Sequence, residues 1–269
     1  MTVFQGIFLG VIQGLTEFLP ISSSGHLVLF QELLGIQMPG VTFEVCAHFG
    51  TLLAIFVAFR RELGEIIAKT LAYLRGTRRH IRDIQLPLLL VFGSLPAAIV
   101  GIAGRDWLTG LYQGSQVVGW ALVITGTILW FSDRLARYQG KLADQISVGD
   151  ALFIGLGQAL ALLPGISRSG STIAFGLMKG LERETAARFS FLLAIPAIGG
   201  ATLLELGELG ALGQQIGLAP LVAGTIAAAL AGYLAIGLLL HLIRRGPLIL
   251  FSYYTWTVGA LLIIWSIWK

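Results

Sequence analysis

The sequence predicts an all-α polytopic membrane protein: an inverted-topology repeat with six transmembrane helices and two re-entrant helical hairpins. The first observation is composition, because the 269 residues are 56% hydrophobic and only 12% charged, which is typical of a chain that crosses a membrane several times. The second is a set of apolar stretches that are each long enough to span a bilayer. The third is a polar motif between two short apolar arms, and this motif occurs twice.

The first polar motif, residues 13–26, interrupts an apolar run that resumes at Leu27. Each flanking arm has roughly 15 residues, fewer than the ~20 that a helix needs to cross the hydrocarbon core. Pro20 and Gly25 bracket three serines, which predicts a helix that stops, a short loop, and a second helix that starts near Gly25. We therefore expect a re-entrant hairpin whose loop lines a polar cavity, since polar groups at membrane depth are costly.

The longer apolar stretches follow in two groups of three. After the first hairpin come 43–59, 84–104 and 116–132; short arms at about 150–163 and 170–178 then flank a second polar motif, 163–172, and 186–206, 219–241 and 248–268 follow. The order is a hairpin and three spans, twice.

Two pairs of similar sequence segments support an internal repeat. I-S-S-S-G (21–25) matches I-S-R-S-G (166–170) at an offset of 145, and A-H-F-G-T-L-L-A-I (47–55) matches A-R-F-S-F-L-L-A-I (187–195) with six of nine residues identical. We expect one membrane domain, 1–269, with repeat 1 at about 1–140 and repeat 2 at about 141–269. An odd number of complete spans in each repeat predicts that the second is inverted relative to the first.

The charges predict the orientation. Of the 18 Lys and Arg residues, 15 fall in four segments on one side of the predicted spans: 60–83, 133–150, 179–188 and 241–247. The positive-inside rule makes that side cytoplasmic and places both termini outside. The first hairpin then enters from outside and the second from the cytoplasm, so that their tips meet near the midplane.

Two restarted helices whose N-termini face one centre present unpaired N–H groups and positive dipole ends, which together form an anion site. The serines and Thr172 of both motifs supply caps and further donors, and Arg168 supplies a planar fork suited to phosphate. Gln13 and Glu17 are four residues apart, hence on one helix face, as metal ligands or orienting acceptors. His26 is placed to act as a general acid–base or as a nucleophile.

Each role has a structural alternative. Glu17 and Arg168 can form an ion pair without catalysis, the serines can be ordinary caps, and His26 can be a satisfied core histidine. We interpret His48, Cys46 and His241 as structural, because no polar residues surround them in the sequence.

With these residues in view, the chain resembles the bacterial undecaprenyl-diphosphatase family, integral membrane enzymes linked to bacitracin resistance. The resemblance covers essentially the whole length and rests on two signatures, a Glu/Gln-x-x-x-Glu element running into L-P-x-S-S-x-G-H, and P-G-x-S-R-S-x-x-T. The matching residues are Gln13, Glu17, Ser22, Ser23, His26, Ser167, Arg168, Ser169 and Thr172. Gln13 is an amide where the commonest form of the family has a carboxylate, which weakens the case for two carboxylates holding a metal.

The resemblance implies hydrolysis of undecaprenyl diphosphate to the monophosphate and phosphate, dependent on a divalent cation, Mg²⁺ or Ca²⁺. The expected location is the outer side of the bacterial cytoplasmic (inner) membrane, where recycling of the carrier serves cell-wall synthesis. Expected partners are the polyprenyl diphosphate and membrane lipids, with no nucleic acid; whether the chain forms a homodimer stays open. The roles we expect are catalytic for Glu17, Ser23, His26 and Arg168, substrate-binding for Ser22, Ser24, Gly25, Ser167, Ser169, Gly170 and Thr172, and metal-binding for Glu17 and Gln13.

We favour Ser23 as the nucleophile with His26 as its base, because the two are three residues apart at a helix start; attack by His26, or by water that His26 activates, stays open. A lipid phosphatase of the phosphatidic-acid type is disfavoured because its second histidine segment is missing. A polyprenyl-phosphate transporter or flippase is the alternative from another class, since inverted repeats with broken helices are typical of secondary transporters.

Overall fold

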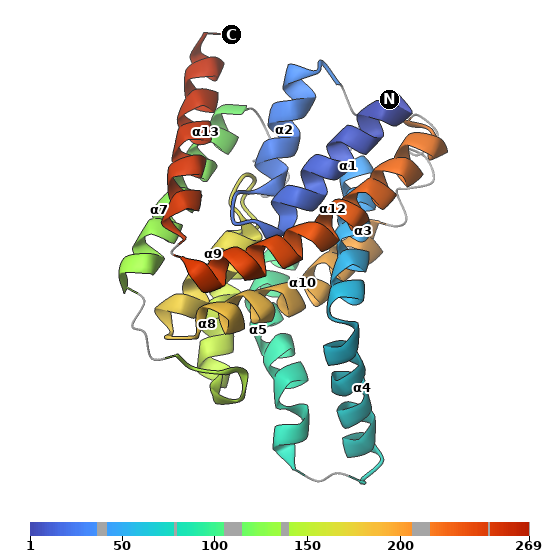
Figure 1. Cartoon of the computed structure of the whole chain (residues 1–269), viewed down its shortest axis with the longest axis vertical. Helices are drawn as coiled ribbons and strands as arrows, with labels where there is room; N and C mark the ends of the chain where they lie inside the picture. Colours follow the sequence, from blue (N-terminus) through green and yellow to red (C-terminus); the bar gives the residue numbers. More distant parts are fainter. Residues whose placement is uncertain are drawn as a thin grey trace.

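The structure is a computed structural model that describes residues 1–36, 42–77, 80–104, 115–135, 140–205, 216–246 and 248–268. Its α-helices are α1 (Val3–Phe18), α2 (Ser23–Leu33), α3 (Thr42–Ala58), α4 (Arg60–Leu74), α5 (Gln85–Ala103), α7 (Ser115–Leu135), α8 (Val148–Leu160), α9 (Arg168–Met178), α10 (Arg183–Glu205), α12 (Leu218–Arg245) and α13 (Ile249–Ile267). Two short 3₁₀ helices cover Ile81–Ile84 and Ala143–Gln145. The all-α class predicted from the sequence is confirmed (Figure 1).

Several helices of the protein are long and apolar enough to cross a membrane. In the part of the chain that the structure describes, α5, α7, α10, α12 and α13 are each long and apolar enough to cross a bilayer. The helix α3 meets that test only together with α4, and the pair is bent by 78°. The protein is thus a multi-pass membrane protein with five or six membrane-capable helices; the inversion of the repeat and the re-entrant nature of the hairpins stay predictions.

Three predicted boundaries differ from the structure. The segment 60–83, expected as a loop, begins with the 15-residue helix α4, whose Glu65 and Lys69 form an i,i+4 pair at 3.5 Å. The returning helices begin earlier than expected, α2 at Ser23 rather than near Gly25 and α9 at Arg168 rather than near 170. The reason is local, because a serine directly before each helix accepts a backbone hydrogen bond from its first turn and fixes the start there.

The two short helix pairs share one register. The helices α1 and α8 begin at Val3 and Val148, and α2 and α9 run over 23–33 and 168–178, all at the offset of 145 that separates the sequence motifs. None of these four helices exceeds 16 residues.

Small residues let α1 approach α12 closely. A Cβ added at Gly6 would lie 2.5 Å from the Pro220 carbonyl oxygen, and one at Gly14 would lie 2.5 Å from that of Ala228, so backbone meets backbone along this crossing, as is typical of membrane helices. The last turn of α1 then inserts Phe18 edge-on against Phe191 of α10, with ring centroids 5.3 Å apart. This packing fixes the end of α1 that carries Glu17.

Candidate active site

Two capped helix N-termini form the frame of the site. The Ser22 hydroxyl accepts a hydrogen bond from the Gly25 backbone N–H at 3.2 Å, and the Ser167 hydroxyl accepts one from that of Gly170 at 3.0 Å. Helix geometry leaves other N–H groups of each first turn without helical partners, where they favour an anion. Ser22 is the one non-glycine residue with a positive φ, 70°, among the residues that the structure describes, and such backbone strain is frequent at functional sites.

The two motif loops contact each other, as the sequence predicts. The Gly165 N–H donates to the Ser24 hydroxyl at 3.3 Å, and the Ser169 hydroxyl donates to the Leu19 carbonyl at 3.0 Å. The second motif therefore donates both bonds, and the first accepts them. Gly165 has φ +87°, and an added Cβ would lie 2.8 Å from Cβ of Ala121 on α7, so glycine is required at this junction.

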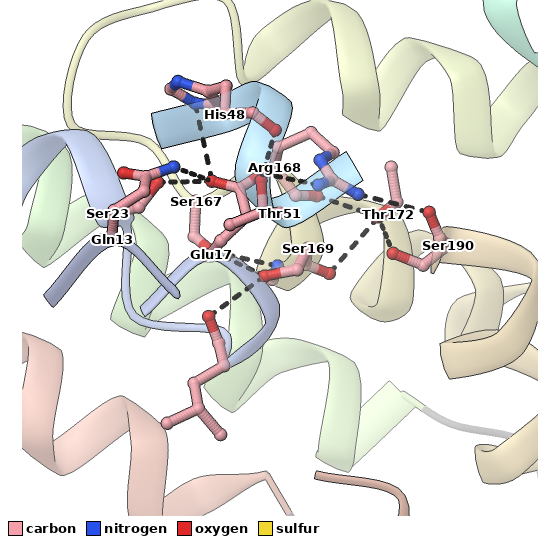
Figure 2. A network of polar contacts seen from close by, with 12 residues as sticks. Gln13, Glu17, Ser23, His48, Thr51, Ser167, Arg168, Ser169, Thr172 and Ser190 are labelled. Atoms are coloured by element: carbon pink, nitrogen blue, oxygen red, sulfur yellow. Dashed lines mark hydrogen bonds and ion pairs between the residues drawn. The ribbon is translucent and has the colours of Figure 1, made fainter. Parts of the chain in front are cut away.

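Glu17 lies at the centre of a polar network (Figure 2) and is only 7% exposed. Its Oε2 accepts hydrogen bonds from Ser23 Oγ at 2.6 Å and from Gln13 Nε2 at 3.0 Å, and it lies 3.5 Å from Nε2 of His48. Its Oε1 accepts from a terminal nitrogen of Arg168 at 2.6 Å. One carboxylate thus joins side chains from α1, α2, α3 and α9.

Arg168 is oriented from two sides. One terminal nitrogen donates to Glu17, and the other donates to the Ser190 backbone carbonyl on α10 at 3.2 Å. The hydroxyls of Ser190 and Thr172 share a hydrogen bond of 2.6 Å, and Thr172 also donates to the Arg168 carbonyl at 2.8 Å. This arrangement holds the planar guanidinium beside the α9 N-terminus.

His26 takes a different pose from the one expected. Its Nδ1 lies 2.8 Å from the Ser22 carbonyl, and its Nε2 lies 2.8 Å from the hydroxyl of Tyr254 on α13. The expected hydrogen bond between Ser23 and His26 is not formed, because Ser23 donates to Glu17 and both nitrogens of His26 have other partners. The three-residue spacing alone would allow the contact, but tertiary partners compete for both groups: the Glu17 carboxylate of α1 takes the Ser23 hydroxyl, and Tyr254 of α13 occupies Nε2 of His26.

The family is decided by comparison with known sequences. The profile of the family described as bacitracin resistance protein BacA matches residues 6–261. The chain belongs to the BacA family. It is 44% identical over 265 residues to a protein of Halothermothrix orenii named undecaprenyl-diphosphatase, with 98% of each chain covered. Proteins of the same name from Desulforapulum autotrophicum and Carboxydothermus hydrogenoformans are 43% and 41% identical, with 98% of this chain covered in both cases and 98% and 97% of theirs.

The structure places three further residues at the site that the sequence analysis did not predict there. The sequence motifs give no reason to place His48 at the site, yet its Nε2 lies 3.5 Å from Glu17 Oε2 and joins the polar network. Ser190 and Tyr254 were not singled out, and they contact Arg168 and His26. The sequence holds one indication that His48 is special: in the matching nine-residue segments, 47–55 and 187–195, it aligns with Arg188. Tyr254 had none, because nothing in the sequence pairs α13 with α2.

The divalent cation implied by the BacA resemblance can be tested against these side chains. Gln13 is fully buried, and its Oε1 has no hydrogen-bond partner in the structure. His48 Nδ1 lies 2.8 Å from the Glu44 carbonyl, so in the neutral ring Nδ1 carries the proton and the Nε2 lone pair faces Glu17 Oε2. The Glu17 carboxylate, the Gln13 amide oxygen and the His48 lone pair are donor types that cations bind. It is the Gln13 nitrogen, however, that faces Glu17, and the described residues hold no group of three or more His, Cys, Asp and Glu side chains placed to bind a metal.

Proposed function

We propose that this protein is a membrane phosphatase that hydrolyses undecaprenyl diphosphate to undecaprenyl phosphate and inorganic phosphate. The curated relatives carry the name of this activity over nearly their whole length. The observation that carries the proposal in the structure is the Glu17 carboxylate, which joins the serine motif, the arginine motif and His48 into one buried network. A diphosphate hydrolase needs these parts: an attacking group, a base, and positive charge for the phosphoryl oxygens.

In the proposed complex the terminal phosphate lies between the N-termini of α2 and α9. Arg168 and the backbone N–H groups of the two first turns bind its oxygens, where the charge of the transition state is spread. The capping hydroxyls of Ser22 and Ser167, with Ser24, Ser169 and Thr172, hold both first turns in place. Gly25 and Gly170 sit against those capping serines, because an added Cβ would lie 3.2 Å from Ser22 Oγ and 3.1 Å from Ser167 Oγ.

We assign Ser23 as the nucleophile, with Glu17 as the group that receives its proton. The 2.6 Å hydrogen bond between Ser23 Oγ and Glu17 Oε2 supports this assignment. As the Oγ–phosphorus bond forms, the Ser23 proton moves to Glu17, the bond from the terminal phosphorus to the bridging oxygen breaks, and undecaprenyl phosphate leaves with that oxygen. Water then hydrolyses the phosphoserine and releases inorganic phosphate.

Attack by His26, or by water that His26 activates, is the alternative, and covalent trapping decides between them. Rapid quench of the enzyme with a substrate labelled in the terminal phosphate should leave acid-stable label on serine. Acid-labile label on histidine, or an active Ser23→Ala variant, would exclude Ser23 as the nucleophile.

A divalent cation, Mg²⁺ or Ca²⁺, would be held by Glu17 and Gln13, with His48 beside them. When bound, it would supply positive charge to the phosphate oxygens and a template for the diphosphate. Gln13 and His48 would orient Glu17, and Glu17 would still accept the proton of Ser23.

We further propose that the two short helix pairs are re-entrant hairpins that enter from opposite sides of the bacterial inner membrane, with the site open to the outer side. Two features support this topology. The α1, α2, α8 and α9 helices are all shorter than the ~20 residues of a span. Both termini also lie at one end of the long axis, and the turn after α4 lies at the other, in the basic segment (Figure 1).

Phosphate release by purified, detergent-solubilised protein tests the function, since no vectorial process contributes there. We expect stoichiometric release of phosphate and undecaprenyl phosphate with Mg²⁺ or Ca²⁺ present. No release under those conditions would favour the polyprenyl-phosphate transporter, which the names of the relatives do not support.

A further inference from the structure

The hydrogen bond at Nδ1 determines which nitrogen of His26 can accept a proton. A backbone carbonyl only accepts hydrogen bonds, so the 2.8 Å contact with the Ser22 carbonyl places a proton on Nδ1. Nε2 is then the one ring atom with a lone pair in the neutral form. Any proton that His26 accepts or returns must pass through Nε2.

That atom faces a tyrosine rather than the proposed nucleophile. Tyr254 Oη lies 2.8 Å from Nε2, and the two rings are parallel to within 4°, with centroids 5.6 Å apart. Because Nε2 of the neutral ring has no proton, the phenol must be the donor. The bond joins residues that are 228 positions apart in the sequence.

Packing around the pair fixes its geometry. One turn beyond His26, Val28 and Leu29 of α2 pack into a cluster with Val118 and Leu122 of α7 and with Val258 and Leu262 of α13. His26 is 3% exposed, whereas Tyr254 is 43% exposed. The tyrosine hydroxyl therefore lies between a buried imidazole and the surface of the helix bundle.

We propose that Tyr254 is a relay residue of the phosphatase reaction, and this inference rests on the proposed function. As water attacks the phosphoserine formed at Ser23, Tyr254 Oη gives its proton to His26 Nε2 and takes one from the water. The water oxygen forms the new bond to phosphorus, the bond from phosphorus to Ser23 Oγ breaks, and the proton held by Glu17 returns to Oγ. The phenol stays neutral, and the His26 ring becomes an imidazolium. The reverse transfer returns the proton to the released phosphate, so protons balance over the cycle.

A matched pair of variants tests the role of the hydroxyl. Tyr254→Phe keeps the ring that packs beside His26 and removes only the oxygen; we expect kcat for phosphate release from undecaprenyl diphosphate in detergent to fall about 100-fold, with little change in KM. Tyr253→Phe removes the hydroxyl of the neighbouring tyrosine, which packs on Trp256, and should behave as wild type. Equal kcat values for Tyr254→Phe and wild type would overturn the proposal.

A double-mutant cycle separates a relay from a merely structural role. If Tyr254 acts through His26, the double variant His26→Gln, Tyr254→Phe should be no slower than His26→Gln alone, whereas additive losses would overturn the relay. ¹⁵N spectra of histidine-labelled protein give a readout without turnover. The His26 Nε2 signal, assigned with His26→Gln, should shift in Tyr254→Phe and stay in place in Tyr253→Phe. An unshifted signal refutes the hydrogen bond itself, while a wild-type protein that releases no phosphate refutes the proposed function instead.

Discussion

Arg168 and Glu17 form an ion pair of 2.6 Å across 151 residues of sequence, and this pair joins the two halves of the chain at the site. Both side chains are largely buried, with 15% and 6% of their surface exposed. Removing one partner of such a pair costs about 3–5 kcal/mol, because the other charge is left uncompensated. The pair therefore has a structural role, and the variants below separate it from the catalytic role that we propose for both residues.

Replacement of Arg168 by lysine should lower kcat/KM by about 10²–10³-fold, the usual cost of a lost oxyanion donor. Lysine keeps the charge beside Glu17, but a single ammonium cannot reach Glu17, Ser190 and a phosphate in the way that the guanidinium fork does. Initial rates of phosphate release give the kinetics, and gel filtration in detergent shows that the variant is folded. Arg244→Lys, at the Glu184 pair remote from the site, is the control, and near-normal turnover of Arg168→Lys would leave Arg168 with the structural role alone.

Replacement of Glu17 by glutamine should abolish most activity, since an amide cannot take the Ser23 proton, while the similar shape keeps a partner for Arg168. Gln13→Glu, in contrast, should be tolerated and should lower the cation concentration for half-maximal rate, because a second carboxylate beside Glu17 strengthens a cation site. Cation titrations of both variants provide the measurement. An active Glu17→Gln enzyme together with an unchanged midpoint in Gln13→Glu would remove both residues from the chemistry.

His48 should contribute to turnover although it lies outside the sequence motifs. His48→Leu removes the imidazole that faces Glu17 Oε2 at 3.5 Å, and we expect a loss of about 10-fold or more in kcat, as for other residues that orient a catalytic ligand. The exposed His241 of α12 offers a control, since His241→Leu changes the same residue type far from this network. Equal rates for the two variants would show that His48 is dispensable.

Gly165 should be required for the fold of the second motif loop. Alanine there must adopt a φ of +87° and place its Cβ 2.8 Å from Cβ of Ala121, and the backbone strain alone costs about 1–3 kcal/mol. Thermal unfolding in detergent should show a clearly lower midpoint for Gly165→Ala. Gly149→Ala, in an open position of α8, should keep or raise the midpoint, and a Gly165→Ala protein as stable as wild type would contradict the steric argument.

The proposed topology places the turn after α4 in the cytoplasm. Cysteine introduced at Thr77, an exposed residue of this turn, in a background where Cys46 is replaced by serine, should react with a membrane-impermeant thiol reagent only after the cells are opened. Labelling of intact cells at this position would reverse the orientation of the whole chain.

The sequence by itself determined the features that depend on short spacings. Apolar stretch length predicted the membrane-capable helices, the four-residue spacing placed Gln13 beside Glu17, and the serine motifs placed the two capped N-termini, whose contact across the repeat the structure confirms. These features follow from the helix period and from hydrogen bonds within one turn, so residues that are close in the sequence are enough to predict them.

Only the tertiary structure decided which side chain each of these groups contacts. Ser23 donates a hydrogen bond to Glu17 rather than to His26, and His48 of α3 lies beside the same carboxylate. Tyr254 of α13 contacts Nε2 of His26. Each of these outcomes depends on how separate helices pack: glycine contacts set the closeness of α1 and α12, and an apolar cluster sets α13 against α2. Packing of this kind joins residues far apart in the chain through many weak contacts, and no local pattern in the sequence encodes it.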